Sequence, residues 1–334
     1  ISNDSQLEFL LRNQDKLGDY KTFEELQEHV LEVDEAWQWL KQELGFEDVF
    51  IQENRERALQ FVYAGGSEIL YRFCQDENGK GEEVRRLVAA ELLGRFREVK
   101  YHKGDLEKEI AYPVANGIEA AWKANTELTG TGLKAWEEDR FLPVMEIGEK
   151  PTRTCMSYRD GIYKKCLLSC FDSNKKVVFM ERNEKIVFRA IVRLTKGSFS
   201  GCEGKKKAVE FVDLTGKKDS ADDVGGKEEL VLFVERPYHK GLSDIGQAVS
   251  LLVQMTQQKA VALHARLVFS KDYQPYLQGE PFVKTKYYVY ISASKNGNQY
   301  LDSLGGAATV STSERYEKSM LLVEYGGDDA FGVA

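Results

Sequence analysis

Three of the five cysteines lie within the segment TCMSYRDGIYKKCLLSC, residues 154–170. Thiolates bind zinc, attack carbonyl carbons or form disulfides, whereas a thiol in apolar surroundings packs as a small side chain. A strand over residues 165–171 would place Cys166 and Cys170 on one face, about 13 Å apart at ~3.3 Å per residue. In a strand, that separation would exclude a shared zinc ion or a disulfide. A helix would bring the two thiols together, but the β-rich neighbourhood favours the strand, so the sequence predicts two buried structural thiols.

Cys155 is the cysteine with a candidate chemical role. It precedes the predicted strand in a loop flanked by Arg153 and Arg159, whose positive charge would favour the thiolate form. A cysteine nucleophile also needs a nearby base, and the four histidines supply the candidates: His29, His102, His239 and His264. The alternative interpretation is a partly buried structural thiol.

Two arginines form a second candidate site, for an anion. In KIVFRAIVRL, strand alternation places Ile186, Phe188, Ala190, Val192 and Leu194 on one apolar face. Arg189 and Arg193 lie on the other face, where two guanidinium groups can bind a carboxylate or phosphate. The alternative is pairing with acidic side chains of neighbouring strands, for which Glu181 and Glu210 are available.

The segment ERPYHKGLSDIGQAV predicts a strand that runs through a short loop into a helix. Ser243 is placed to cap that helix. The unpaired N–H groups and partial positive charge of a helix N-terminus can hold phosphate groups. Asp244 would add a negative charge to the first turn, which suits capping and repels an anion.

This strand, turn and helix, together with the strand that follows, resemble the GNAT-type N-acetyltransferases over roughly residues 163–292. That family binds the acyl-CoA pyrophosphate with an [RQ]-x-x-G-x-[GA] turn. Gly246 and Ala248 match this turn, and Ser243 stands where the family has Arg or Gln. The resemblance implies acetyl-CoA as the cofactor, with Ser243, Gly246 and Ala248 at its pyrophosphate.

The same resemblance implies catalytic residues. Glu235, at the end of the preceding strand, would be the general base, and Tyr273 or Tyr276 the general acid. Both assignments have structural alternatives. Glu235 can pair with Arg236 or Lys240, and the tyrosines can pack at the edge of the sheet.

The elements that would position these residues fall into two regions. Apolar residues at helical spacing predict helices near residues 23–44, 52–63, 82–101 and 117–125, with an interruption at Gly65 and Gly66. Short β-branched and aromatic runs then predict a mostly antiparallel mixed sheet, with tight turns at residues 172–174 and 182–184. Its strands are expected near residues 165–171, 176–182, 185–194, 208–214, 229–236, 266–270, 286–292 and 319–325. A further helix is predicted over residues 243–264. The expected fold class is α+β, with an acidic helical domain at 1–130 and a sheet domain at 150–334 that is GNAT-like at about 163–292.

Composition limits the possible partners. Residues 1–150 carry 19 Lys and Arg against 32 Asp and Glu, whereas the remainder carries 27 against 22. A nucleic-acid interface needs clustered positive charge, so the first region is a poor candidate for one. The aromatic run KYYVYIS beside Lys284 and Lys286 could stack bases, but sheet packing is the favoured explanation.

The longest apolar run is the five residues Leu230 to Val234, far below the roughly 20 that span a bilayer. An odd cysteine count without C-x-x-C pairing is typical of reduced thiols. We therefore expect a soluble, cytoplasmic protein that binds no metal and no membrane.

Three functions follow from these patterns. The favoured one is a non-catalytic binding or regulatory protein with a protein partner, built on an acetyltransferase-like domain. The alternative is an active N-acyltransferase that uses acyl-CoA, and the third is an enzyme with Cys155 as its nucleophile.

Overall fold

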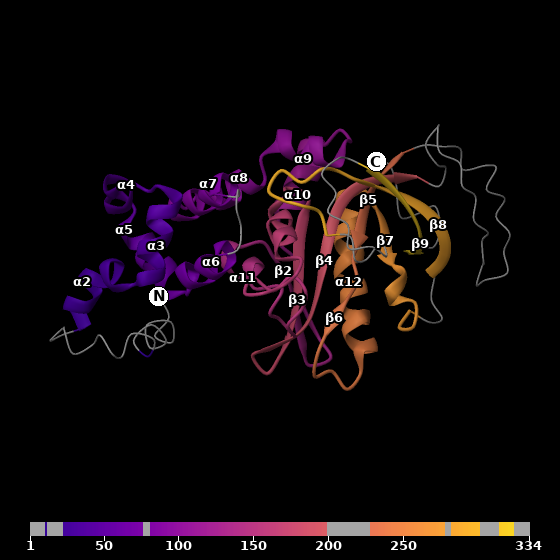
Figure 1. Ribbon diagram of the computed structural model, residues 1–334. Helices are drawn as coiled ribbons and strands as arrows, with labels where there is room; N and C mark the ends of the chain where they lie inside the picture. Colours follow the sequence, from indigo (N-terminus) through magenta and orange to yellow (C-terminus); the bar gives the residue numbers. More distant parts are fainter. Residues whose placement is uncertain are drawn as a thin grey trace. The chain divides into compact units, whose positions relative to one another are not determined.

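The computed structural model describes residue 11 and residues 23–75, 81–198, 228–277, 282–300 and 314–323 (Figure 1). The chain is α+β and divides into two compact units. The helical unit comprises residues 1–100, 140–148 and 154–164, and the sheet unit comprises residues 101–139, 149–153 and 165–334. The boundary differs from that expected from sequence, because residues 101–130 pack with the sheet.

The helical unit contains short helices joined by tight turns. They are α2 (Phe23–Val33), α3 (Glu35–Leu44), α4 (Asp48–Glu53), α5 (Arg55–Tyr63), α6 (Gly66–Cys74), α7 (Gly81–Leu92), α8 (Phe96–Lys100) and α11 (Phe141–Met145). The single helix predicted over residues 23–44 is wrong: the Asp34 carboxylate accepts from the Trp37 N–H and starts a new helix there. The predicted interruption at Gly65 is confirmed, since this residue adopts φ 79° between α5 and α6.

The sheet of the sheet unit is mixed and strongly curled. Its described strands are β1 (Glu127–Gly130), β2 (Leu133–Glu138), β3 (Lys175–Arg182), β4 (Lys185–Ser198), β5 (Glu229–Val234), β6 (Tyr238–His239), β7 (Arg266–Ser270), β8 (Phe282–Ile291) and β9 (Glu314–Val323). Their order is β1-β2-β3-β4-β5-β7-β9-β8, and β6 pairs with β4. Because β8 also pairs with β4, the strands β4, β5, β7, β9 and β8 close a ring. The strand predicted over residues 208–214 lies outside the described residues.

The long strand β4 gives the sheet its centre. The predicted turn before it is confirmed: Arg182 pairs with Lys185, and the two residues between them, Asn183 and Glu184, have φ values of 50° and 61°. Such a two-residue turn matches the twist of antiparallel strands. Along one edge β4 pairs with β3 and then β8, and along the other with β6 and β5.

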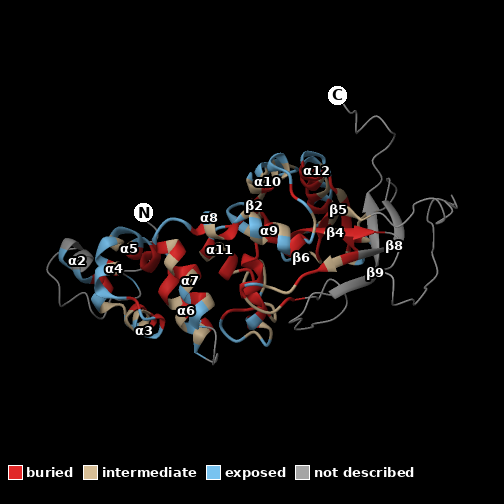
Figure 2. Ribbon diagram, turned by 90° about the horizontal axis from the view of Figure 1, so that it is seen from above, coloured by how far each residue is buried: buried red, intermediate tan, exposed pale blue. Residues whose placement is uncertain are grey.

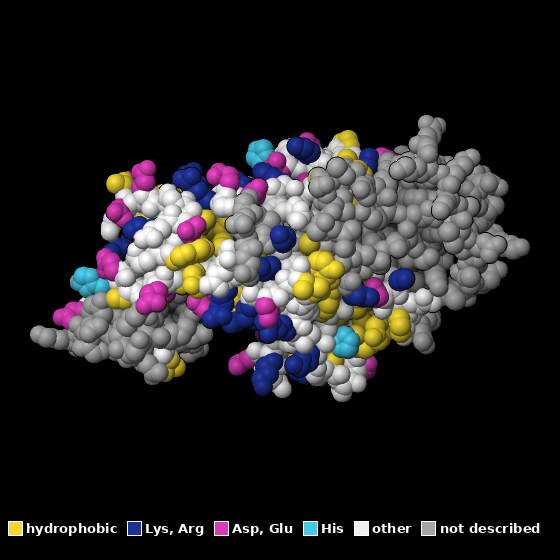
Figure 3. All heavy atoms as spheres, viewed as in Figure 1, with side chains coloured by type: hydrophobic (Ala, Val, Ile, Leu, Met, Phe, Trp, Pro, Cys, Tyr) yellow, Lys and Arg dark blue, Asp and Glu magenta, His cyan; other side chains and the backbone are white. Residues whose placement is uncertain are grey.

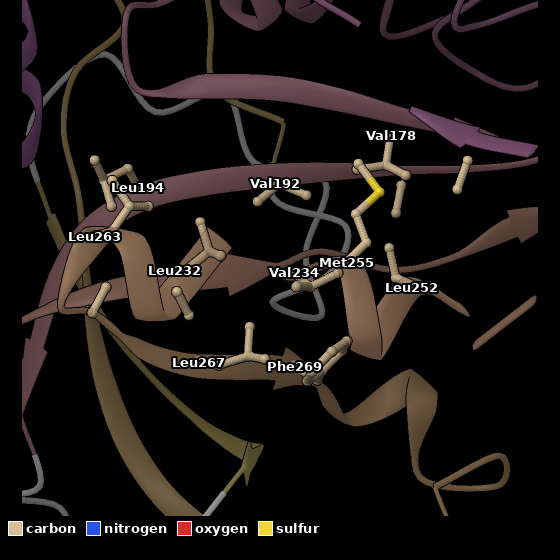
Figure 4. Close-up of a cluster of buried hydrophobic side chains, with 14 of the residues drawn as sticks. Val178, Val192, Leu194, Leu232, Val234, Leu252, Met255, Leu263, Leu267 and Phe269 are labelled. Atoms are coloured by element: carbon tan, nitrogen blue, oxygen red, sulfur yellow. The ribbon is translucent and has the colours of Figure 1, made fainter. Parts of the chain in front are cut away.

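Helix α12 (Ile245–Leu263) carries the chain from β6 to β7, so that β5 and β7 run parallel. Its inner face and the sheet form the core shown in Figure 4. Phe188, Ala190, Val192 and Leu194 lie in this core, so the predicted apolar face of β4 is confirmed there, with Ile186 half-buried. Figure 2 shows α12 beside α10 (Asn116–Lys123), each with an exposed outer face; α9 (Lys103–Ile110) precedes them.

Candidate functional site

The lysines that open β3 bury their side chains on opposite faces of the sheet. The Lys175 side chain is 2% exposed and that of Lys176 is 0% exposed. Neighbouring residues of a strand point to opposite faces, and a buried ammonium group requires its own acceptors and counter-charge. The sheet unit therefore contains two buried charge clusters, one around Gln299 and one around Glu137.

The Gln299 cluster consists of Asp172, Lys175, Arg193, Glu235 and Gln299. The Lys175 ammonium donates to the Ser169 carbonyl at 2.9 Å, to the Ser169 hydroxyl at 3.0 Å and to the Asp172 carboxylate at 3.2 Å. It also donates to the Gln299 side-chain oxygen. Asp172 is fully buried, so its carboxylate and the Lys175 ammonium are paired out of contact with solvent.

Asp172 also fastens the segment 292–300 to the sheet. One carboxylate oxygen accepts from the Ser294 hydroxyl at 2.7 Å and from the Asn296 amide at 3.1 Å. The other accepts from the Gln299 amide nitrogen at 3.3 Å, which also donates to the Ser292 carbonyl at 3.0 Å. One buried carboxylate therefore organises a segment far away in the sequence.

Gln299 joins this part of the cluster to a second ion pair. Its side-chain oxygen accepts from Arg193 Nη1 at 3.2 Å. Arg193 also donates to Glu235 Oε1, from Nε at 3.0 Å and from Nη2 at 2.7 Å, and both side chains are buried. The neutral amide thus bridges two buried ion pairs.

The two arginines predicted to bind an anion have different partners in the structure. Arg193 pairs with Glu235 rather than with the predicted Glu181, which lies opposite Ile186 beside an irregularity of register in β3. Arg189 Nε donates to the Lys150 carbonyl at 3.0 Å, and its guanidinium carbon lies 4.0 Å from the centre of the Tyr238 ring. Each guanidinium group already has a partner from the protein. Glu210, the other predicted partner, lies outside the described residues.

Of the two predicted general acids, Tyr273 lies beside Glu235, but not in an open site. The Tyr273 hydroxyl donates to the Glu235 carbonyl at 2.9 Å, and Tyr273 is fully buried. Burial, aided by the charges of Asp272 and Glu235, raises the pKa of Tyr273 well above its ordinary value of 10. Tyr276 is partly buried and packs against the core. The predicted alternatives for Glu235 are wrong, since Arg193 is its partner and Arg236 pairs with Asp272.

The turn before α12 is capped by a carboxylate. Asp244, rather than the predicted Ser243, is the N-cap, and its Oδ1 accepts from the Gly246 N–H at 2.8 Å. Ser243 is exposed, whereas Ala248 is buried in the core. A β-carbon added at Gly246 would lie 3.0 Å from that same oxygen. An N–H group that a phosphate would need is therefore already bound.

The predicted strand over residues 165–171 is wrong. Cys166 and Cys170 lie in the 3-10 helix η2 (Lys164–Phe171), and both are buried as predicted. A helix end leaves carbonyl groups without partners in the helix, and the Lys175 ammonium binds one of them, that of Ser169. Cys166 Sγ lies 3.6 Å from the Gln299 carbonyl oxygen.

Cys155 lies in the helical unit and is half-buried. Its carbonyl accepts from the Tyr163 N–H at 2.8 Å, and the Arg159 guanidinium lies 5.1 Å from the centre of the Tyr158 ring. His29, the histidine of the same unit, is bonded to Glu32 at 2.9 Å. Among the described residues, no group of three or more His, Cys, Asp or Glu side chains could hold a metal ion.

The Glu137 cluster, on the α12 side of the sheet, consists of Glu137, Lys176 and Lys259. The Lys176 ammonium donates to the Ala124 carbonyl at 2.9 Å, to Asn125 at 2.6 Å and to Glu137 at 3.2 Å. Lys259 lies 2.9 Å from the same Glu137 oxygen.

The two ammonium groups of this cluster also donate hydrogen bonds to carbonyl groups at the C-terminus of α10. Lys259 donates to the Ala121 carbonyl at 3.0 Å, and both lysines donate to the Ala124 carbonyl. Cations are favourable at a helix C-terminus, where carbonyl groups lack partners in the helix. The cluster thus fastens α10 to β2, β3 and α12.

Lys176 predicts an unusual pH dependence of stability. Desolvation lowers its pKa from 10.5 to about 8, an effect that Glu137 opposes and Lys259 reinforces. Between these two pKa values the unfolded chain holds more protons than the folded one, so the contribution of Lys176 to stability rises with pH. We therefore expect wild type to gain stability relative to Lys176→Met as the pH rises. The unfolding free energy of wild type minus that of the variant should increase by up to about 3 kcal/mol from about pH 7.5 to 10.5.

Urea unfolding at several pH values measures this difference. Lys185→Met is the matched control, because Lys185 is exposed, and its difference from wild type should stay constant. A constant difference for Lys176→Met as well would contradict the lowered pKa.

Comparison with known proteins gives no relative for this chain: no family model, no curated protein and no solved structure matches it. In the described part of the chain, no helix is long and apolar enough to cross a membrane. A function for this chain is therefore inferred from the side-chain contacts within its two units.

The sequence pointed to Arg193 and Glu235 of the Gln299 cluster but not to their pairing, and the Glu137 cluster was missed, although one signal for it was available. In the segment KKVVFMER, Lys176 falls on the same face as Val178 and Met180, which form the core. A lysine in phase with core residues indicates a buried ammonium group. Its partners Glu137 and Lys259 are distant in sequence and carry no such signal.

Proposed function

We propose that this chain is a non-catalytic binding or regulatory protein with a protein partner. Its sheet unit would be an acetyltransferase-like framework that serves structure rather than chemistry. The observation that carries the proposal is the turn before α12, where the Asp244 carboxylate is bonded to the Gly246 N–H at 2.8 Å. A pyrophosphate at that position would meet a negative charge instead of a free donor.

The state of the candidate catalytic residues supports the same proposal. A general base must reach the proton that it removes, and Glu235 is buried against Arg193. A general acid works best with a pKa near the working pH, and burial raises the pKa of Tyr273 instead. Both residues are engaged in bonds that hold the sheet together.

The charge of the helical unit favours a basic partner. Acidic residues outnumber basic ones by 24 to 16 over its residues 1–100, 140–148 and 154–164. Figure 3 shows acidic and basic side chains interspersed over the helices of this unit. This distribution disfavours nucleic acid and favours a protein with a positively charged surface.

The cofactor prediction is tested by isothermal titration calorimetry with acetyl-CoA. We expect no saturable binding to wild type at protein concentrations of tens of micromolar, because the cap excludes the pyrophosphate. Asp244→Ser is the informative variant, since serine keeps a cap for α12 and removes the negative charge. Binding that appears only in Asp244→Ser would support exclusion by the carboxylate.

Saturable binding to wild type that is abolished by Gly246→Glu would overturn the proposal in favour of the N-acyltransferase. Val49→Glu is the matched control, because Val49 is exposed in the helical unit and its substitution should leave the titration unchanged.

A further inference from the structure

The segment 292–300 is fastened to the sheet partly by an Asn–Gly pair. Such a pair is prone to deamidation, because glycine has no side chain to shield its backbone nitrogen. The sequence contains three of them: Asn78–Gly79, Asn116–Gly117 and Asn296–Gly297. The first lies outside the described residues, and the second is exposed at the start of α10. Asn296 is instead 3% exposed, and its amide donates to the Asp172 carboxylate at 3.1 Å.

Packing explains why both residues of this pair are needed. The Asp172 carboxylate only accepts hydrogen bonds, so the side chain that faces it must be a donor, as the Asn296 amide is. A β-carbon added at Gly297 would lie 3.1 Å from the Lys165 carbonyl oxygen and 3.2 Å from Leu168 Cβ. The contacts that fasten the segment therefore require a chemically labile dipeptide.

The folded segment keeps the reacting atoms of this dipeptide apart from each other. Deamidation begins when the Gly297 nitrogen attacks the side-chain amide carbon of Asn296. In the structure the Gly297 N–H donates to the Ser294 hydroxyl oxygen at 3.0 Å, and the Asn296 amide nitrogen is bonded to Asp172. Both bonds must break before the attack, so the reaction requires local opening of the segment.

We propose that Asn296 is a deamidation site whose reaction releases the segment 292–300 from Asp172. The Gly297 nitrogen forms a bond to Asn296 Cγ, and the bond from Cγ to the side-chain nitrogen breaks. Ammonia leaves with the proton of the Gly297 nitrogen, and a succinimide ring remains. Water then opens the ring at either carbonyl group, which gives aspartate or isoaspartate.

The product no longer fits the site. Its carboxylate would face the Asp172 carboxylate in place of a donor, out of contact with solvent. Lys175 already pairs with Asp172 at 3.2 Å. Two buried carboxylates at this distance repel each other unless one of them holds a proton at neutral pH, and both outcomes favour release. The reaction does not reverse, so it would convert a transient opening into a lasting one.

Incubation of the full chain at mildly alkaline pH tests the site, with mass spectrometry of its peptides to follow Asn296 and Asn116. Ser294→Ala removes the hydroxyl that binds the Gly297 N–H. We expect Asn296 to deamidate more than about tenfold faster in this variant than in wild type. The exposed Asn116 is the internal reference and should react at the same rate in both proteins. Equal rates at Asn296 in the two proteins, or no reaction there in either, would overturn the proposal.

Asn296→Asp reproduces the product and gives a second readout. Hydrogen exchange should show the amides of residues 292–300 losing protection by more than about tenfold. Asn296→Ala removes the donor without adding a charge, so its loss should be smaller. Asn116→Asp makes the same change at the exposed pair and should leave this protection as in wild type. Unchanged protection in Asn296→Asp would also overturn the proposal, and no outcome depends on the acetyl-CoA titration.

Discussion

Replacing Glu235 with alanine is expected to lower the free energy of unfolding by about 3–5 kcal/mol, because it leaves the Arg193 guanidinium buried without its counter-charge. The size of this loss distinguishes a structural role of Glu235 from a catalytic one. A catalytic group is commonly held in a strained or repulsive arrangement, so its removal costs little stability or even increases it. A large loss would therefore identify Glu235 as part of the framework.

Urea unfolding of Glu235→Ala measures the loss, with Glu127→Ala as the matched control. Glu127 also forms an ion pair, with Lys134 at 3.2 Å, but its side chain is 58% exposed. Surface pairs contribute about 0–1 kcal/mol, so the control should change little. Removing both charges in Arg193→Met with Glu235→Leu should restore much of the stability. A loss below about 1 kcal/mol in Glu235→Ala would contradict a structural role.

Replacing Asp172 with alanine should cost at least as much, about 3–5 kcal/mol. This substitution leaves the Lys175 ammonium buried beside neutral acceptors only, and it removes the acceptor of Ser294, Asn296 and Gln299. Guanidinium chloride unfolding measures the loss of stability. Hydrogen exchange should show the amides of residues 292–300 losing protection, because Asp172 holds that segment.

The double variant Asp172→Ala with Lys175→Met provides the control for Asp172→Ala. Removing both charges should cost less than removing Asp172 alone, since no unpaired ammonium then remains. The cycle also needs the single variant Lys175→Met. If the loss of stability in the double variant equalled the sum of the losses in Asp172→Ala and Lys175→Met, the two residues would not be directly coupled.

The parts of the fold that sequence predicted are those with local patterns. Alternation in β4 and the turn at Asn183 and Glu184 depend on residues next to each other in the chain, and both are confirmed. Strands β1 and β2 were missed because β2 buries Glu137 and Glu138, which a pattern of apolar residues treats as exposed. The 3-10 helix at Cys166 and Cys170 was missed because LLSC fits a strand or a helix equally well.

The site was less predictable than the fold for a related reason. The turn residue Asp172 gave no sign of its burial, since turn residues are ordinarily solvated. Its partner Gln299 lies 127 positions away in the sequence. Arg193 was predicted to bind an anion, and Glu235 was predicted to be a general base. A carboxylate at the end of a strand can serve either as a general base or as the counter-charge of a buried arginine, and the sequence does not distinguish the two.

The wide spacing of the Gln299 cluster has a consequence during protein synthesis. Lys175 and Gln299 are separated by 124 positions, so a ribosome that adds about 5–20 residues per second takes roughly 6–25 s to make the second after the first. During that interval Asp172 and Lys175 lack the segment that covers them, and the strand β8 that helps to close the ring is also missing. The bonds of Lys175 and Asp172 to Gln299 therefore form only after Gln299 has been made, and the sheet unit completes its folding late.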